Sequence, residues 1–223
     1  MRKHVLFILL LLLAVLVGVS GCGSSKTSSS TSTGAKTETR SVSHFTAINL
    51  TSIGTLTVEQ ARKDSLTITA DSAILPLITS TVADDTLTLS VKAGASLGTP
   101  TQLSYKVTVK DLKALSLTGA GAILATDINT TALAVSMNGV GKMTISGQAD
   151  NQTVNISGAA TYDGTTFATK TTTASITGVS HVIVRVSNTL NARVNGLGTI
   201  EYIGSPQLTQ TIQGGGAVRK ITG

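Results

Sequence analysis

The second half of the chain repeats one short pattern of apolar and polar positions. In each repeat an apolar residue, a polar residue and a glycine follow one another, and a second apolar residue stands four positions after the glycine. The positions between them are mostly Ser, Thr, Lys or Arg, so the segments alternate as half-buried β-strands do. The glycines stand 18 to 20 residues apart, at Gly119, Gly139, Gly158, Gly178, Gly196 and Gly214.

A period near 19 residues is too short for repeats of paired helices and favours stacked β-coils. We expect each coil to pair in parallel with the next, about 4.8 Å away. Glycine would occupy the corners, where positive φ or a close backbone approach is needed. The polar residues before the glycines would stack as a hydrogen-bonding ladder. The pattern therefore predicts an all-β fold, a right-handed parallel β-helix over about 111–223. An antiparallel sandwich is the alternative, and the agreement of three files of positions across six repeats disfavours it.

Residues 41–110 are rich in predicted strands but less regular. Strand-like alternation covers 45–60, as two strands around a turn, and three further segments. Asp84 and Asp85 form a turn signal, whereas 74–82 is ambiguous between a strand and a helical turn. The three further segments are 65–70, 86–91 and 103–109. We expect this part to start the solenoid and to cover one of its open ends.

The N-terminus has the pattern of an export signal. A basic segment, 1–4, precedes an unbroken apolar run, 5–17, that as a helix would span only about 20 Å of a ~30 Å hydrocarbon core. Residues 19–22, Val-Ser-Gly-Cys, resemble the lipobox of bacterial lipoproteins. The resemblance implies a signal peptide over 1–21 and acylation of Cys22, which would anchor the mature protein to membrane lipid. An ordinary cleaved signal is the alternative.

The segment that follows is predicted to separate the anchor from the folded part. Residues 22–40 contain the lipidated Cys and a stretch of Ser, Thr, Gly and charged residues, with no apolar residue larger than Ala after the Cys. Such a composition cannot bury enough surface to order itself, so we expect a flexible tether with a reach of about 25 Å. The folded domain is assigned to 41–223.

Composition excludes several function classes. Hydrophobic residues make up 41% of the chain and charged residues 13%. The single Cys excludes a disulfide framework and a multi-thiolate metal site, and three His leave little material for zinc. The net charge of +6 would fall to +4 with the loss of Arg2 and Lys3. Scattered basic residues and few aromatics disfavour nucleic-acid binding. We expect no metal and no cofactor.

The coils offer little catalytic chemistry. Acid–base catalysis on a sugar needs two carboxylates about 5–10 Å apart. Asp163 and Glu201 share one outward file but lie two coils apart, about 10 Å by the coil spacing. Arg219, one coil beyond Glu201, is expected to form a surface ion pair with it. His181 is interpreted as a lone surface histidine. The glycine-rich stretches at 119 and 214 lack the following helix of a nucleotide-binding loop. We predict no catalytic residues.

Several stretches together resemble a known family. They are FTAINLTSIGTLTV, ILPLITSTVADDTLTLSV, KVTVKDLKALSLTGAG and, most specifically, the ending VNGLGTIEYIGSPQLTQTIQGGGAVRKI. Over about 45–223 the chain is similar to the putative auto-transporter adhesin head GIN domain family, a domain of unknown function in exported bacterial proteins. Ala160 and Ser180 depart from the family's Gly-x-Gly form. The resemblance implies a β-helical exported domain and supplies no binding residues.

The combined expectation is an extracytoplasmic, lipid-anchored cell-envelope protein with a non-enzymatic, adhesin-like binding head. Its partners would be membrane lipid through acylated Cys22 and a surface polysaccharide or a protein ligand, with no nucleic acid. A polysaccharide-active β-helix enzyme is one alternative. A self-assembling structural module, a homo-oligomer, is another, because the last coil would leave an unpaired β edge.

Overall fold

The computed structural model describes residues 34–97 and 102–223, which form a β-solenoid of about five turns. Its coils are built from long strands that pair in parallel, β9 with β10 and β10 with β11. The parallel solenoid is therefore confirmed and the antiparallel sandwich excluded. The strands of this part are β8 (Ala114–Leu117), β9 (Ala120–Met137), β10 (Val140–Gly178), β11 (His181–Gly196), β12 (Thr199–Ile203), β13 (Gln207–Gln213) and β14 (Ala217–Lys220).

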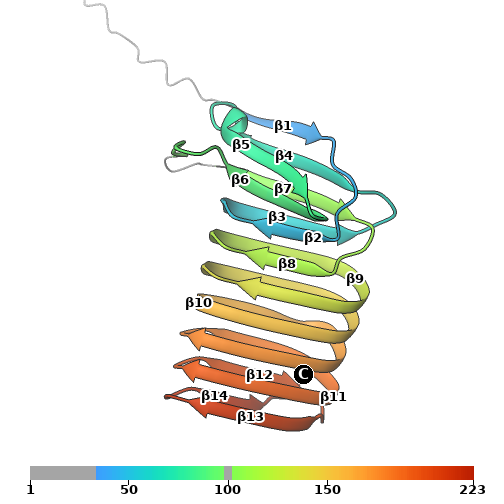
Figure 1. Cartoon of the computed structure of the whole chain (residues 1–223), viewed down its shortest axis with the longest axis vertical. Coiled ribbons are helices and arrows are strands. Elements are labelled where there is room, and N and C mark those ends of the chain that lie inside the picture. Colours follow the sequence, from blue (N-terminus) through green and yellow to red (C-terminus); the bar gives the residue numbers. More distant parts are fainter. Residues whose placement is uncertain (1–33, 98–101) are drawn as a thin grey trace, which may run out of the picture. The chain divides into compact units, whose positions relative to one another are not determined.

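Five of the six repeated glycines stand where one strand ends and the next begins, at the corners on the left of Figure 1, and Gly158 lies within β10. Gly158, Gly178, Gly196 and Gly214 have φ between +110° and +138°. At Gly139 the cause is close approach, because an added Cβ would lie 2.0 Å from the Gly119 carbonyl oxygen. Both predicted reasons for a corner glycine are confirmed.

Ser180 fits a corner where the family pattern has a second glycine. Its buried hydroxyl donates to the Gly158 carbonyl at 3.0 Å and accepts from the Ala160 amide at 3.2 Å. The side chain thus satisfies backbone groups of the neighbouring coil.

The predicted apolar files form the core of the solenoid. Met137, Ile156 and Ile176 precede corner glycines by two positions and are at most 2% exposed. In the last coil Ile212 is 39% exposed, since no further described strand covers it.

The predicted polar ladder does not form. The six polar residues before the corner glycines are exposed, and no hydrogen bond among the described residues joins one to the next. Water competes for such exposed groups. Thr118 instead donates to Asn49 and Asn138 to Ser136.

The coils of the N-terminal part are not stacked in the order in which they occur in the sequence. β2 (Ala47–Leu50) and β3 (Ile53–Gln60) pair in parallel with β8 and β9 on one side. On the other side they pair in parallel with β6 (Thr86–Val91) and β7 (Leu103–Val109). The coil formed by 47–60 therefore lies between two coils that follow it in the chain, an arrangement that the sequence pattern did not predict.

An antiparallel layer covers this end of the solenoid, as expected. β4 (Ser65–Asp71) pairs with β7, and β5 (Ile78–Ala83) forms a hairpin with β6. The hairpin turn is Asp84-Asp85, with φ of 48° and 56°, as two-residue hairpin turns require. The ambiguous stretch contains a single 3₁₀ turn, η1 (Leu75–Leu77), before β5.

The last residues of the segment predicted to be a tether form a strand instead. β1 (Ala35–Arg40) pairs antiparallel with β4, and the hydroxyls of Thr37 and Thr69 are 2.9 Å apart. Arg40 fixes the strand by donating to the carbonyls of Leu75 and Ile78. Composition alone missed β1 because its side chains are almost all exposed and its order comes from pairing with the cap.

Candidate functional site

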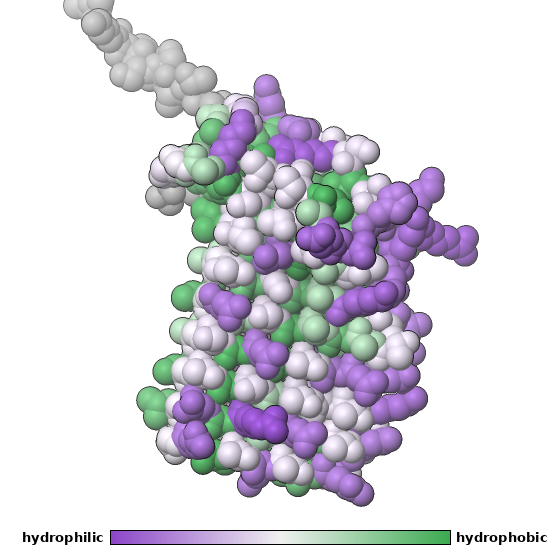
Figure 2. Space-filling model, viewed as in Figure 1, coloured by the Kyte–Doolittle hydropathy of each residue, from purple (hydrophilic) through white to green (hydrophobic). Residues whose placement is uncertain are grey.

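A polar groove runs across successive coils on the side where β10 bends, half a coil from the glycine corners. It has a volume of about 760 Å³ and is lined by residues of five successive coils. A second hollow of about 410 Å³ shares Asn129, Thr130 and Thr131 with it. None of the described residues that line the two hollows is aromatic. Figure 2 shows hydrophilic residues along the right-hand edge, the side on which the strands bend in Figure 1.

The groove walls are held by contacts between coils. Gln60 accepts from the Asn129 amide at 2.7 Å and donates to its carbonyl at 3.1 Å. Gln148 donates to the Asn129 side chain at 3.2 Å, and Lys170 pairs with Asp150 at 2.8 Å. The groove therefore presents hydroxyls, amides and charges from a fixed scaffold. Sequence reasoning did not single out these residues, although polar side chains stand 11 and 12 positions after each of Gly119, Gly139 and Gly158.

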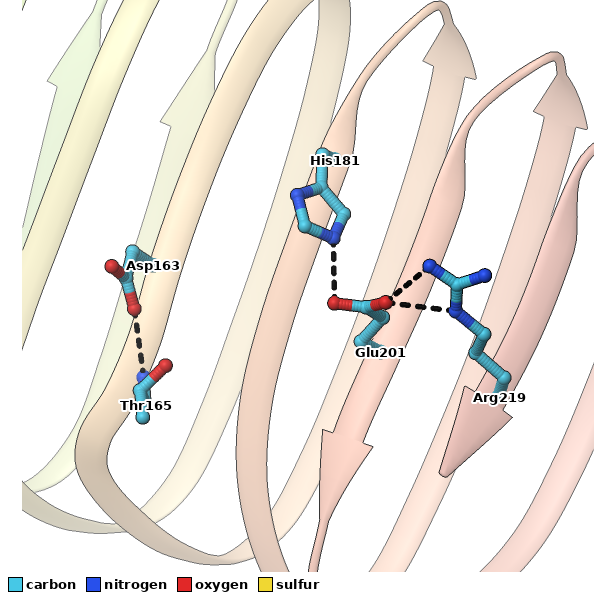
Figure 3. Close-up of polar contacts among 5 residues, drawn as sticks. All are labelled: Asp163, Thr165, His181, Glu201 and Arg219. Atoms are coloured by element: carbon cyan, nitrogen blue, oxygen red, sulfur yellow. Dashed lines mark hydrogen bonds and ion pairs between the residues drawn. The ribbon is translucent and has the colours of Figure 1, made fainter. Parts of the chain in front are cut away.

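A cluster of charged side chains lies on another stretch of the coils (Figure 3). Glu201 on β12 accepts two hydrogen bonds from Arg219 on β14, at 2.8 Å from Nε and 2.5 Å from Nη2. Its other oxygen lies 2.8 Å from His181 Nε2. A carboxylate only accepts, so Nε2 carries the proton in this contact. The predicted Glu201–Arg219 pair is confirmed.

The interpretation of His181 as a lone surface histidine is wrong. The register partner of Glu201 on β11 is Ile183, so His181 reaches the carboxylate diagonally, from two residues away along the strand. Lys142 and Asp163 form the same diagonal contact two coils earlier, with Nζ and Oδ2 4.0 Å apart. The sequence signal was a basic residue three positions after one corner glycine and an acid five positions after the next.

The Arg219 guanidinium, with help from His181, holds the pKa of Glu201 below its usual value of 4.5, against the effect of desolvation. The carboxylate is therefore ionised at neutral pH and engaged by Arg219 and His181, so it is poorly suited to serve as a general acid.

The low pKa of Glu201 predicts an acid-dependent loss of stability. A carboxyl group with a depressed pKa stabilises the fold above its unfolded value and loses that contribution as pH falls through the folded value. We expect Glu201→Gln to lower the free energy of unfolding by about 1 kcal/mol at pH 7 and by much less at pH 3. Urea unfolding of both proteins at both pH values measures this. Asp150→Asn, in the exposed pair with Lys170, is the control and should have little effect. An equal loss from Glu201→Gln at both pH values would contradict the assignment.

The other candidate residues do not assemble into a catalytic or metal site. Asp163 accepts from the Thr165 amide at 3.2 Å and faces Lys142, two coils from Glu201 (Figure 3). Within residues 34–97 and 102–223 no group of three His, Cys, Asp or Glu could hold a metal ion. In the same residues no helix is long and apolar enough to cross a membrane. Cys22, the predicted lipidation site, lies outside the described residues.

Comparisons with known proteins agree with the fold. Residues 44–206 match the family model described as "Putative auto-transporter adhesin, head GIN domain". The matched region ends directly before β13. The crystal structure of a putative adhesin from Bacteroides fragilis is 23% identical, with a TM-score of 0.70 over 85% of this chain and 98% of that one. A putative adhesin from Parabacteroides distasonis is 20% identical, with a TM-score of 0.55 over the same shares. At this identity the two structures support the fold alone. No curated protein matches the chain.

Proposed function

The chain belongs to the head GIN domain family of putative auto-transporter adhesins, and from this premise we propose that it is a lipid-anchored envelope protein whose solenoid binds a surface polysaccharide. The family indicates an adhesin-like domain of an extracellular or surface protein. The polysaccharide ligand, the lipid anchor and the absence of catalysis are the proposed parts.

The shape and lining of the polar groove are the observations that support a polysaccharide ligand. The groove crosses five coils and continues into the second hollow, so its length suits an extended chain rather than a compact small molecule. Its lining of Ser, Thr, Asn and Gln offers hydrogen-bond donors and acceptors that match sugar hydroxyls. Binding of a protein segment usually requires apolar pockets for anchor side chains. The largest apolar side chains that line the hollows are Leu133 and Val186, and both are buried.

The state of the acidic residues supports a binding role without catalysis. Glu201 is engaged by Arg219 and His181, and Asp163 faces Lys142. Neither carboxylate lines the groove, where Asp150 is already paired with Lys170. A glycosidase would need two carboxyl groups facing one another across a bound sugar.

The sequence before the head supports the lipid anchor. Cys22 follows small residues directly after a short apolar run, and it is the only thiol of the chain. Acyl chains on this residue would hold the head at the envelope, because two or more chains give stable membrane anchoring where one gives only reversible binding.

The anchor and the display of the head can be tested together in cells. We expect the wild-type protein to incorporate a labelled fatty acid and to sediment with membranes, and Cys22→Ser to lose the label completely. Protease treatment of intact cells should release a fragment of about 34–223 if the head faces outward. Ser25→Ala, in the same segment, is the control and should behave as wild type. Labelling of the Cys22→Ser protein at the wild-type level, or protection of the head until the envelope is broken, would contradict this proposal.

A further inference from the structure

We propose that the groove recognises an acidic polysaccharide and that Arg185 binds the anionic group of its sugar residues. This inference rests on the proposed function and specifies its ligand class. It follows from how Arg185 is placed, from the hydrogen-bond donors that it leaves unused, and from the polar groups beside it.

Arg185 is a held side chain rather than a mobile surface cation. It lies on β11, half-buried in the wall of the groove, and its Nε donates to the Thr165 carbonyl at 2.7 Å. The Thr169 hydroxyl donates to the carbonyl of Arg185 itself at 2.8 Å. Both the backbone and the guanidinium are therefore fixed before any ligand arrives, which lowers the entropic cost of binding.

The guanidinium keeps most of its donors unused. Of its five N–H groups only Nε–H is committed, and none of the described carboxylates forms an ion pair with it. Burial of a charge without a partner is unfavourable. The terminal Nη1 and Nη2 groups can donate in parallel to two oxygens of one carboxylate or sulfate.

Arg40, which has a purely structural role, provides a comparison for the hydrogen bonding of the Arg185 guanidinium. Among the Lys and Arg residues that the structure describes, only Arg40 and Arg185 are not fully exposed. Arg40 is saturated by Glu38, by the hydroxyl of Ser80 and by two carbonyls. Arg185 has no such set of acceptors, and its side chain lies between the groove and Gly223, where an added Cβ would be 3.1 Å from Arg185 Nη2.

The surroundings of Arg185 favour an anion attached to a sugar. Ser187 and Ser205 line the same part of the groove, and Lys220 donates to the Ser205 hydroxyl at 3.0 Å. Lys220 also forms no ion pair with a described carboxylate. Arg185 in the groove wall and Lys220, which contacts the lining residue Ser205, thus both lack carboxylate partners, whereas Asp150 is neutralised by Lys170.

The test compares polymers that differ in charge. Binding of the purified protein is measured to polygalacturonate, to its neutral methyl ester and to dextran sulfate, the last to distinguish sulfate from carboxylate recognition. We expect binding to polygalacturonate, dextran sulfate or both, and much weaker binding to the methyl ester. Arg185→Gln should weaken binding to the preferred polymer about 10- to 100-fold, and Arg185→Lys should lose less, because it keeps the charge but not the paired donors.

Two matched variants make the test specific. Arg193→Gln removes the same charge from an exposed position on β11 outside the groove and should change binding less than twofold. Ala168→Trp fills the groove and should abolish binding to every polymer. Equal losses from Arg185→Gln and Arg193→Gln, or equal binding of the methyl ester, would overturn this inference while leaving a polysaccharide-binding groove. Full binding by Ala168→Trp would instead overturn the proposed function. Melting of each variant by circular dichroism confirms that it is folded.

Discussion

Replacing Gly196 by alanine is expected to lower the free energy of unfolding by about 2–4 kcal/mol. Gly196 has φ of +133°, a conformation that L side chains rarely adopt. An added Cβ would also lie 2.5 Å from the carbonyl oxygen and 3.1 Å from the amide nitrogen of Gly178, both in the backbone of the preceding coil. Neither atom can move without disturbing the pairing of β10 with β11. Backbone strain and steric overlap of the added Cβ therefore both lower the stability of the Gly196→Ala protein.

Gly215 provides a control in the next corner of the stack. A Cβ at this position would meet only Leu197 Cδ2, at 3.0 Å, which is the end of a flexible and exposed side chain. Gly215→Ala should therefore change stability by less than about 0.5 kcal/mol. Urea unfolding followed by circular dichroism measures both variants. A Gly196→Ala protein as stable as the wild type would show that the corner can relax, and would remove close packing as the reason for glycine.

The regular coils could be predicted because their physical requirements repeat along the sequence. The interior of each coil admits apolar side chains at fixed positions, and the corners exclude a Cβ. The same residue types therefore recur every 18 to 20 positions. Met137, Ile156 and Ile176 were recognisable as one buried file for this reason. Each coil provides independent evidence for the same pattern.

The order of the coils could not be predicted in the same way. Local alternation indicates a strand but does not identify its neighbours, which are decided by packing between distant segments. Leu50 and Gly54 pair in register with Leu117 and Gly121, so the first coil does carry a version of the repeat. Ser52 stands where the later coils have the corner glycine, and this single difference hides the relation.

The functional surfaces depend on contacts that cross the coils. The His181–Glu201 contact was missed because it runs diagonally, whereas alignment of the repeats compares residues in the same file. The groove needs the curvature of the bend and the packing of five coils, which no single repeat encodes. Arg185 is distinguished from other basic residues only by its burial and its unused donors.

A buried chain of polar side chains inside the solenoid carries the other large expected effect. Gln152, 4% exposed, donates to the hydroxyl of the fully buried Tyr162, and its Oε1 lies 3.5 Å from the Thr172 hydroxyl. The Thr172 and Thr169 hydroxyls are 2.7 Å apart, and Thr169 in turn donates to the carbonyl of Arg185 at the groove. Burial raises the pKa of Tyr162 well above its usual value, so the phenol stays neutral and needs a hydrogen-bond partner.

Gln152→Leu should lower the free energy of unfolding by about 2–4 kcal/mol, because it leaves the Tyr162 hydroxyl and Thr172 without the side chain that joins them. Tyr162→Phe should cost about 1–2 kcal/mol, since it leaves one Gln152 donor unpaired. The double variant removes both partners at once and should cost less than the sum of the two, with a coupling of about 1–2 kcal/mol. Urea unfolding of the four proteins gives this coupling directly. Additive losses would mean that the two side chains contribute only by filling space.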